Sequence, residues 1–321
     1  MNTTTSLPSL HPSPRRALVL AGGGAAGNAW QIGLVAGLCE VGIDLTEADL
    51  IVGTSAGSTV AAQITSGTRP PELYAAILAE VSQPRSRTGG GSEGRAGVRS
   101  RGAAGAGGVS GPSYLEWSDA IIAASESAAD MRRRMGAAAL ERDASGGADG
   151  ADSAAGARWR DIVAARLPSN DWPRQRVLIT AVDARTGEPV VFDRQSGVDL
   201  VDAVAASTSA MAPYPIGEDR YLNGGYRRSE NADLAAGYER VVVLSPFSGR
   251  SRMPAGWGMD LATQVDELRA GGSQVETVFP DAGAGDVFDA NALDPSTRPQ
   301  AARGGYEQAR VLTDRLADIW R

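Results

Sequence analysis

Short apolar runs along the chain alternate with longer stretches in which apolar residues recur every three or four positions. The apolar runs predict strands at 17–20, 50–52, 176–182, 189–192, 240–244 and 274–279, and another that ends at 221–222. The helical spacing predicts helices at 28–41, 58–65, 71–81, 113–140, 159–167, 201–206, 259–270 and 299–320. Strands that alternate with helices in this way favour an α/β fold with a mostly parallel sheet covered on both faces.

The predicted elements form one domain with a tail, two inserts and an extension. Residues 1–16 are rich in Pro and Ser and are expected to be a disordered tail, 17–245 carry the main domain, and 246–321 add a C-terminal β/α extension packed on it. Two low-complexity inserts, at about 84–112 and 143–156, are expected to be mobile loops because they hold too little apolar area to offset their ordering entropy. The first insert has five arginines between 85 and 111, which favours a solvated loop; peripheral contact with an anionic lipid surface is the alternative.

Composition excludes several classes of function. The 321-residue chain has a net charge of −7, which argues against a nucleic-acid partner. One histidine and one cysteine cannot build a zinc site, and no metal or cofactor is expected. No apolar stretch is long enough for a transmembrane segment, and the first residues lack the apolar run of a signal peptide. We therefore expect a cytoplasmic protein.

The first glycine-rich motif, G-G-G-A-A-G at 22–27, lies between a predicted strand and a predicted helix. Two chemistries use such a turn. A dinucleotide loop holds pyrophosphate at the helix N-terminus, and it needs an acidic residue about 20 positions further on, where Asp44 stands. An oxyanion hole instead uses consecutive backbone N–H groups that no side chain obstructs. The dinucleotide-binding protein remains a remote alternative because the second strand does not end in the required acid.

The second motif, G-T-S-A-G at 53–57, follows a predicted strand and opens a predicted helix. This is the context of a nucleophile elbow, which exposes the hydroxyl of Ser55 and places the N–H of Ala56 for an oxyanion. A serine nucleophile needs a base, and the only histidine, His11, lies in the tail upstream of every motif. A Ser-His-Asp triad is therefore excluded, and the base would have to be a carboxylate.

The motif order identifies a resemblance. A-L-V-L-A-G-G-G-A-A-G, then G-T-S-A-G, then N-G-G 168 residues after Ser55 resembles the patatin-like phospholipases over roughly 17–245. The resemblance implies a three-layer α/β/α fold and a lipid acyl hydrolase with a Ser-Asp dyad, acting on an acyl-ester or phospholipid substrate. It implies Ser55 as the nucleophile and position 223 as the base. The implied oxyanion donors are Gly22, Gly23, Gly24 and Ala56, and the remaining motif glycines are Gly27, Gly53, Gly57, Gly224 and Gly225.

Two residues depart from the family pattern: Ala26, where the family often has Arg, and Asn223, where it has Asp. An amide oxygen cannot take the serine proton at neutral pH. The sequence therefore predicts a hydrolase impaired by Asn223, or a catalytically weak or inactive acyl-lipid-binding protein. Deamidation of the Asn-Gly pair would restore Asp. Another acid could also act as the base, and the candidates from nearby segments are Asp183, Asp193, Asp219 and Asp233.

Overall fold

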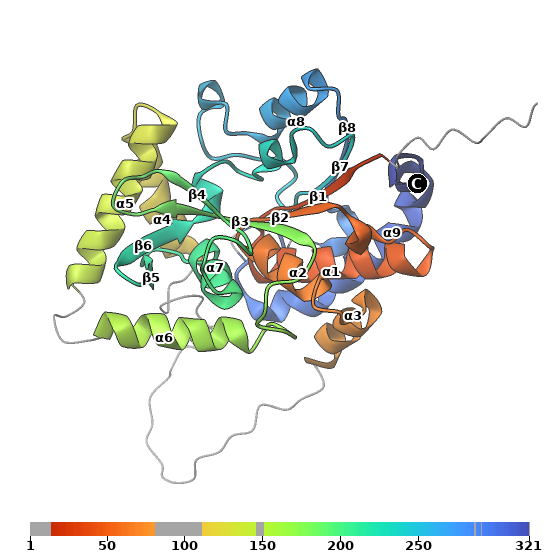
Figure 1. Cartoon of the computed structure of the whole chain (residues 1–321), viewed down its shortest axis with the longest axis horizontal. Helices are drawn as coiled ribbons and strands as arrows, with labels where there is room; N and C mark the ends of the chain where they lie inside the picture. The colour runs from red at the N-terminus through yellow and green to blue at the C-terminus, as the bar shows by residue number, and fades with distance from the viewer. Residues whose placement is uncertain (1–13, 81–110, 146–150, 286, 290, 321) are drawn as a thin grey trace, which may run out of the picture.

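A computed structural model of the chain describes residues 14–80, 111–145, 151–285, 287–289 and 291–320 (Figure 1). Eight strands in this part form one sheet, with the path β5-β6-β3-β2-β1-β7-β8 and with β4 paired to β3. Neighbours among β1, β2, β3, β7 and β8 are parallel, whereas β4, β5 and β6 pair antiparallel. The strands are β1 (Arg16–Leu20), β2 (Leu50–Gly53), β3 (Arg176–Asp183), β4 (Pro189–Phe192), β5 (Tyr214–Ile216), β6 (Asp219–Asn223), β7 (Arg240–Leu244) and β8 (Gln274–Val278).

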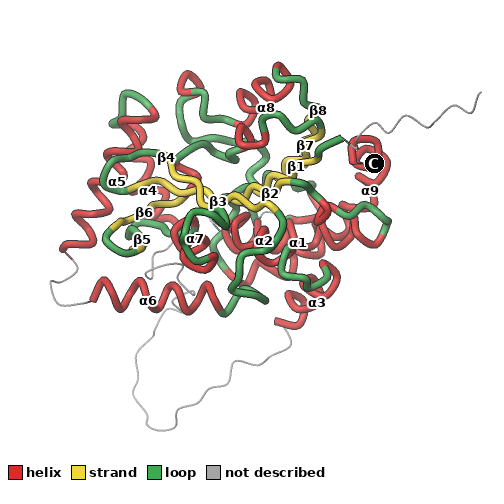
Figure 2. Tube along the Cα trace, viewed as in Figure 1, coloured by secondary structure: helices red, strands yellow, loops and turns green. Residues whose placement is uncertain are grey.

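Helices cover both faces of this sheet, which confirms the predicted α/β fold (Figure 2). One face carries α1 (Gly24–Glu40), α2 (Ala56–Ile64), α3 (Pro70–Ala79), α6 (Ala151–Ala164), α7 (Leu200–Ser207) and α9 (Arg298–Trp320). The other face carries α8 (Leu261–Ala270), and the antiparallel end is covered by α4 (Gly111–Ala123) and α5 (Ala128–Ser145). Within the described residues, no helix is both long enough and apolar enough to cross a bilayer.

The alternation of side chains along the strands builds two separate cores. In β1, Leu18 and Leu20 join the cluster under α1 and α9, whereas Ala17 and Val19 join the cluster under α8. A strand that is apolar on both faces must be covered on both. This explains why the central strands appear in the sequence as continuous apolar runs.

Several boundaries differ from the predicted ones. Most of the predicted insert at 143–156 is helical, because α5 continues to Ser145 and α6 begins at Ala151; the alanine-rich composition that we interpreted as a loop has high helix propensity. Strand β5 was not predicted, since Y-P-I is short and holds a proline that only an edge strand tolerates. Strand β1 begins at Arg16, one residue inside the predicted tail. Residues 1–13 of the predicted tail, 81–110, which hold most of the first insert, and 146–150 of the second insert lie outside the described residues.

The last helix, α9, packs directly on α1 through glycines. A Cβ on Gly33 of α1 would overlap the carbonyl oxygen of Ala302, and a Cβ on Gly305 of α9 would overlap the carbonyl oxygen of Trp30. The indole Nε1 of Trp30 also donates to Gln308 Oε1 at 2.9 Å. The C-terminal extension therefore shares the core that supports the glycine-rich turn at the start of α1.

We predict that Gly33→Ala lowers the free energy of unfolding by about 1–3 kcal/mol, because the added methyl group forces the two helix backbones apart. Intrinsic helix propensity favours Ala over Gly by about 1 kcal/mol, so a loss of stability would report the contact. Urea denaturation measures the difference. Gly256→Ala is the matched control, since a Cβ there meets no atom within 4 Å; equal effects of the two substitutions would contradict the prediction.

Candidate active site

Two strand ends that are far apart in sequence meet on one edge of β3. Ile179 pairs with Gly53 of β2 and also with Phe192 of β4, so β2 and β4 lie on opposite edges. Ala181 pairs with Val190 of β4 and with Asn223 of β6, so β6 lies on the same edge as β2. Because β2 and β6 run toward each other along this edge, the turns that follow them come together, and these turns hold Ser55 and Asn223.

Ser55 occupies a strained turn between β2 and α2. Its backbone has φ 52° and ψ −122°, a conformation that residues other than glycine rarely adopt and that costs on the order of 1–3 kcal/mol. Hydrogen bonds hold it there: the Ser55 N–H donates to Ser207 Oγ at 2.9 Å, and the Ser55 carbonyl accepts from Ser58 Oγ at 2.6 Å. Ser207 ends α7 and is fully buried. This is the backbone geometry expected of a nucleophile elbow.

The glycines of both motifs allow backbone to approach this turn. A Cβ on Gly57 would overlap the carbonyl oxygen of Leu20, and a Cβ on Gly22 would lie 3.3 Å from the Cβ of Ser55. Gly22 and Gly23 lie between β1 and α1, and no acceptor among the described residues takes their N–H groups. Ala56 is the first residue of α2, where the N–H has no intrahelical partner. These donors, with the positive ends of two helix dipoles, can stabilise an anion beside Ser55.

Other segments of the chain pack closely on the first turn of α1. The Ala26 N–H donates to the carbonyl of Ala292 at 3.0 Å, and a Cβ on Gly23 would lie 2.6 Å from the Cβ of Pro246. The carboxylate of Asp44 accepts from both the backbone N–H and the hydroxyl of Thr46, at 2.8 and 2.6 Å. This acid caps a short turn, which disfavours the dinucleotide interpretation of the glycine-rich loop.

The side-chain amide of Asn223 donates to the serine. Its Oδ1 accepts from the Gly225 N–H at 2.9 Å, so the Nδ2 must face the other way, where it donates to Ser55 Oγ at 3.0 Å and to the Ser209 carbonyl at 3.1 Å. One backbone donor and one backbone acceptor thus fix the orientation of the amide. Ser55 Oγ accepts a hydrogen bond from position 223, whereas general-base catalysis needs the opposite polarity.

The other acids named from the sequence are engaged elsewhere. Asp183 and Asp193 cap turns, accepting from the N–H groups of Thr186 and Gln195 respectively. Asp233 forms an ion pair with Arg227 at 2.7 Å, and Asp219 lies 3.8 Å from Arg185. No carboxylate of a described residue is within hydrogen-bond distance of Ser55 Oγ.

Deamidation of Asn223 is opposed by its surroundings. The reaction requires the Gly224 nitrogen to attack the side-chain Cγ, so the amide must rotate out of its three hydrogen bonds. Gly224 is buried, and a Cβ there would overlap the Oγ1 of Thr180, so the peptide has little room to move.

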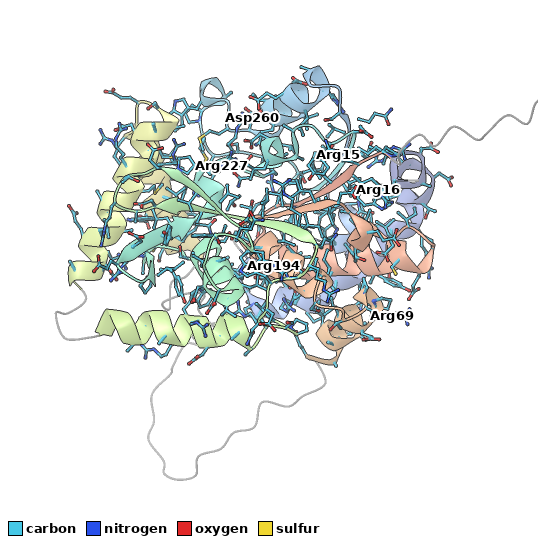
Figure 3. The ribbon with its side chains drawn as sticks, in the orientation of Figure 1. Arg15, Arg16, Arg69, Arg194, Arg227 and Asp260 are labelled. Atoms are coloured by element: carbon cyan, nitrogen blue, oxygen red, sulfur yellow. The ribbon has the colours of Figure 1, made fainter. Side chains whose placement is uncertain are left out.

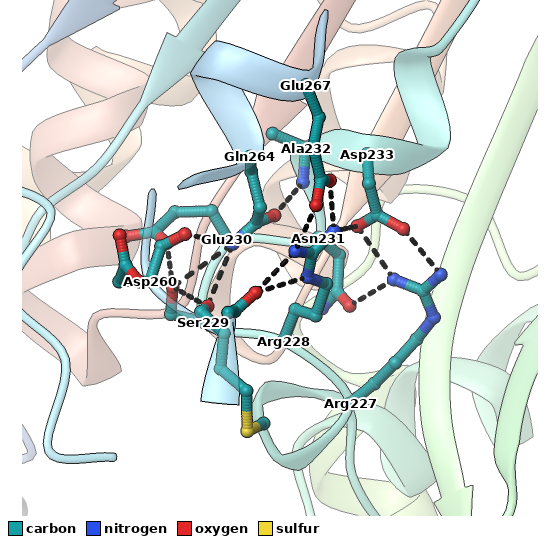
Figure 4. Close-up of polar contacts among 12 residues, drawn as sticks. Arg227, Arg228, Ser229, Glu230, Asn231, Ala232, Asp233, Asp260, Gln264 and Glu267 are labelled. Atoms are coloured by element: carbon teal, nitrogen blue, oxygen red, sulfur yellow. Dashed lines mark hydrogen bonds and ion pairs between the residues drawn. The ribbon is translucent and has the colours of Figure 1, made fainter. Parts of the chain in front are cut away.

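A buried asparagine that the sequence analysis missed, Asn231, contacts both turns, and Figure 4 shows it beside Arg227 and Asp233. The Nδ2 of Asn231 donates to Thr54 Oγ1 at 2.9 Å and to the Gly224 carbonyl at 3.0 Å, and its Oδ1 accepts from Arg227 at 2.8 Å. Asn231 is fully buried with φ 60°, a left-handed conformation that asparagine tolerates. Thr54 precedes the serine and Gly224 follows Asn223, so one side chain fixes both.

Glu230, the residue before Asn231, is a buried acid. Its Oε1 accepts from Ser245 Oγ at 2.9 Å, and Ser229 donates to its Oε2. Burial raises the pKa of Glu230 above its usual 4.5, and the two serine hydroxyls oppose this rise. The acid lies beside the ends of β7 and of the Ser55 turn without contacting Ser55.

Comparisons with known proteins give one family and a set of structural likenesses. The family model described as Patatin-like phospholipase matches residues 18–236, and no curated protein matches the chain. VipD from Legionella pneumophila is similar at 13% identity, with 95% of this chain and 67% of that chain covered and a TM-score of 0.42. The type III effector protein ExoU is similar at 19% identity, with 95% and 54% covered and a TM-score of 0.40. The chain thus spans about half the length of ExoU.

We predict that Asn231→Gly lowers the free energy of unfolding by about 1–3 kcal/mol, because it leaves Thr54 and the Gly224 carbonyl without their buried partner. Glycine keeps the left-handed backbone, so the loss would come from the side chain. Thermal or urea unfolding measures it. Ser248→Gly is the control: its φ is 57°, and Ser248 takes no part in this network, so that substitution is expected to be neutral or slightly stabilising.

A second prediction concerns pH. Because the pKa of Glu230 is raised in the folded chain, the folded state holds this proton more tightly than the unfolded state does. Its contribution to stability is complete below the ordinary value of 4.5 and is lost as pH rises through the folded-state pKa. Glu230→Gln cannot titrate, so we expect the stability of the native chain relative to this variant to fall as pH rises from 4 to 8. Urea titrations across this range test it, and a constant difference would contradict it.

Proposed function

The chain belongs to the patatin-like phospholipase family, and on that premise we propose that it is a lipid acyl hydrolase whose nucleophile is Ser55. The observation that carries the proposal is the Ser55 turn, strained at φ 52°, next to a glycine-rich turn in which no described residue accepts from the N–H groups of Gly22 and Gly23. Strain of this kind persists only where the surrounding structure holds it, and it concentrates at functional sites.

The proposed reaction passes through an acyl-enzyme. Ser55 Oγ attacks the carbonyl carbon of an ester, and the carbonyl oxygen becomes an oxyanion bound by the N–H groups of Gly22, Gly23, Gly24 and Ala56. The C–O bond to the alcohol then breaks, and a water molecule later releases the acid. The hydroxyl proton of Ser55 must leave during attack and finally protonate the departing alcohol.

Asn223 limits this reaction at the proton transfer. Its Nδ2 points a proton toward Ser55 Oγ, so the hydroxyl proton has no acceptor at position 223 and must pass to water. Loss of a positioned general base costs roughly 10²–10⁴ in rate. We therefore propose that the chain hydrolyses esters slowly through its oxyanion donors, or holds an acyl lipid without turning it over. The exclusion of the four nearby acids from Ser55 supports this over a substitute base.

We predict that Asn223→Asp raises the hydrolysis rate of a short-chain p-nitrophenyl ester by about 10²–10⁴-fold, because a carboxylate accepts the proton that an amide cannot. In the variant, the carboxylate oxygen that replaces Nδ2 would be repelled by the Ser209 carbonyl oxygen, which lies 3.1 Å from the Asn223 Nδ2. We expect this repulsion to keep the gain at the lower end of the range. Initial rates at pH 8 measure it.

Ser55→Ala in the Asn223→Asp background is the control and is expected to abolish the gain. If the gain in rate is small, covalent labelling by a fluorophosphonate, followed by peptide mass analysis, distinguishes a slow hydrolase from an acyl-lipid-binding protein. Labelling of Ser55 without turnover would favour the acyl-lipid-binding protein. Full activity of the native chain would show that another group is the base and that position 223 has been misassigned.

A further inference from the structure

A cavity away from Ser55 is lined by three arginines and one acid, Glu267. It has a volume of about 380 Å³ and lies between α5, the segment after Tyr226, and the loop that leads into α8. Arg132 comes from α5, whereas Arg227 and Arg228 follow the turn that begins at Asn223. Trp257 and Met259 form an apolar part of the wall. In Figure 3, Arg227 and Asp260 lie on the same side of the sheet as α8.

The three guanidinium groups are unequally compensated. Arg227 forms a two-pronged pair with Asp233 at 2.7 and 2.9 Å, and Arg228 forms one with Glu267 at 2.5 and 2.9 Å. Arg132 instead donates its Nε to the Gly187 carbonyl at 2.8 Å, and no described acid lies within ion-pair distance of it. Burial lowers the pKa of the Arg132 guanidinium. The negative charge of Glu188 opposes this decrease, and the positive charge of Arg227 adds to it. A like charge and partial burial thus make Arg132 the guanidinium with most to gain from an anion.

We propose that this cavity binds a phosphate group through Arg132, Arg227 and Arg228. Guanidinium groups match phosphate oxygens with paired N–H donors, and several can share one phosphate. The volume accommodates a phosphate with a small attached group, for which Trp257 and Met259 offer an apolar contact. A free phosphate monoester and the phosphate head group of a lipid share this chemistry. The proposal is independent of ester hydrolysis, since none of the three arginines is a donor to the reacting atoms.

Arg132 is the informative position to change. Arg227 also donates to Asn231, so its removal would disturb the Ser55 turn, and Arg228 is tied to Glu267. Arg132 is partly exposed and makes one backbone hydrogen bond, so Arg132→Gln should leave the fold intact. Arg134→Gln makes the same charge change two residues along α5, where the side chain pairs with Asp130 at 2.7 Å and does not line the cavity.

Isothermal titration with inorganic phosphate, at constant ionic strength against chloride, tests the proposal on the full chain. We expect saturable binding that Arg132→Gln weakens by roughly tenfold or more, equivalent to about 1.4 kcal/mol, and that Arg134→Gln leaves unchanged. Arg132→Lys should recover only part of the affinity, because it restores the charge without the paired donors. Thermal unfolding without phosphate checks that each variant is folded.

Absence of saturable phosphate binding would overturn the proposal, as would equal weakening by Arg132→Gln and Arg134→Gln. Two further arms separate the sources of the phosphate. Vesicles of phosphatidylcholine with phosphatidic acid, compared with phosphatidylcholine alone, test a lipid head group. Competition by glycerol 3-phosphate tests a soluble ester. Where inorganic phosphate binds, added binding to the phosphatidic acid vesicles that is lost in Arg132→Gln assigns the lipid head group, whereas competition by glycerol 3-phosphate without vesicle binding assigns a soluble ester.

Discussion

The edge of β3 that is shared by β2 and β6 is the constraint on which the site depends. Strand β2 pairs parallel to β3 and ends opposite Ile179, whereas β6 pairs antiparallel and ends opposite Ala181 on the same edge. The two turns must then meet, whatever side chains they carry. A slip of one residue in either register would turn Ser55 or Asn223 away from the other, because successive side chains point to opposite faces.

Below this edge, Asn231 ties both turns to the body of the domain. Its amide reaches the residue before Ser55 and the residue after Asn223, and Arg227 in turn holds Asn231 and Asp233. A fully satisfied buried polar network of this kind favours one arrangement, since any alternative leaves a buried donor or acceptor unpaired. The network explains how a strained serine backbone can persist at φ 52°.

The polarity of the Asn223 side chain gives the site its particular chemistry. The Gly225 N–H requires an oxygen on one side, and the Ser209 carbonyl requires a donor on the other. An amide satisfies both, whereas an ionised carboxylate would satisfy only the first. The turn around position 223 therefore suits the asparagine that it contains, and the backbone N–H groups that we propose as oxyanion donors take no part in its hydrogen bonds. In the proposed function, acyl binding and proton transfer would thus depend on different groups.

Features that short segments encode could be predicted from the order of residues. Strand β7 was predicted at its observed bounds because R-V-V-V-L is a short run with three consecutive β-branched valines, and the Ser55 turn followed from G-T-S-A-G because that backbone needs small neighbours. Spacing within a segment is enough for both. The prediction of a loop at 143–156 was wrong for most of this stretch, because its low complexity indicates a loop whereas its alanines favour a helix. Three features became visible only in the folded chain: the edge of β3 that β6 shares with β2, the direction of the Asn223 amide, and the positions of Asn231 and the three arginines. Asn223 meets Ser55, and Asn231 meets Thr54, across 168 residues of sequence or more, so these contacts arise only when the sheet has formed.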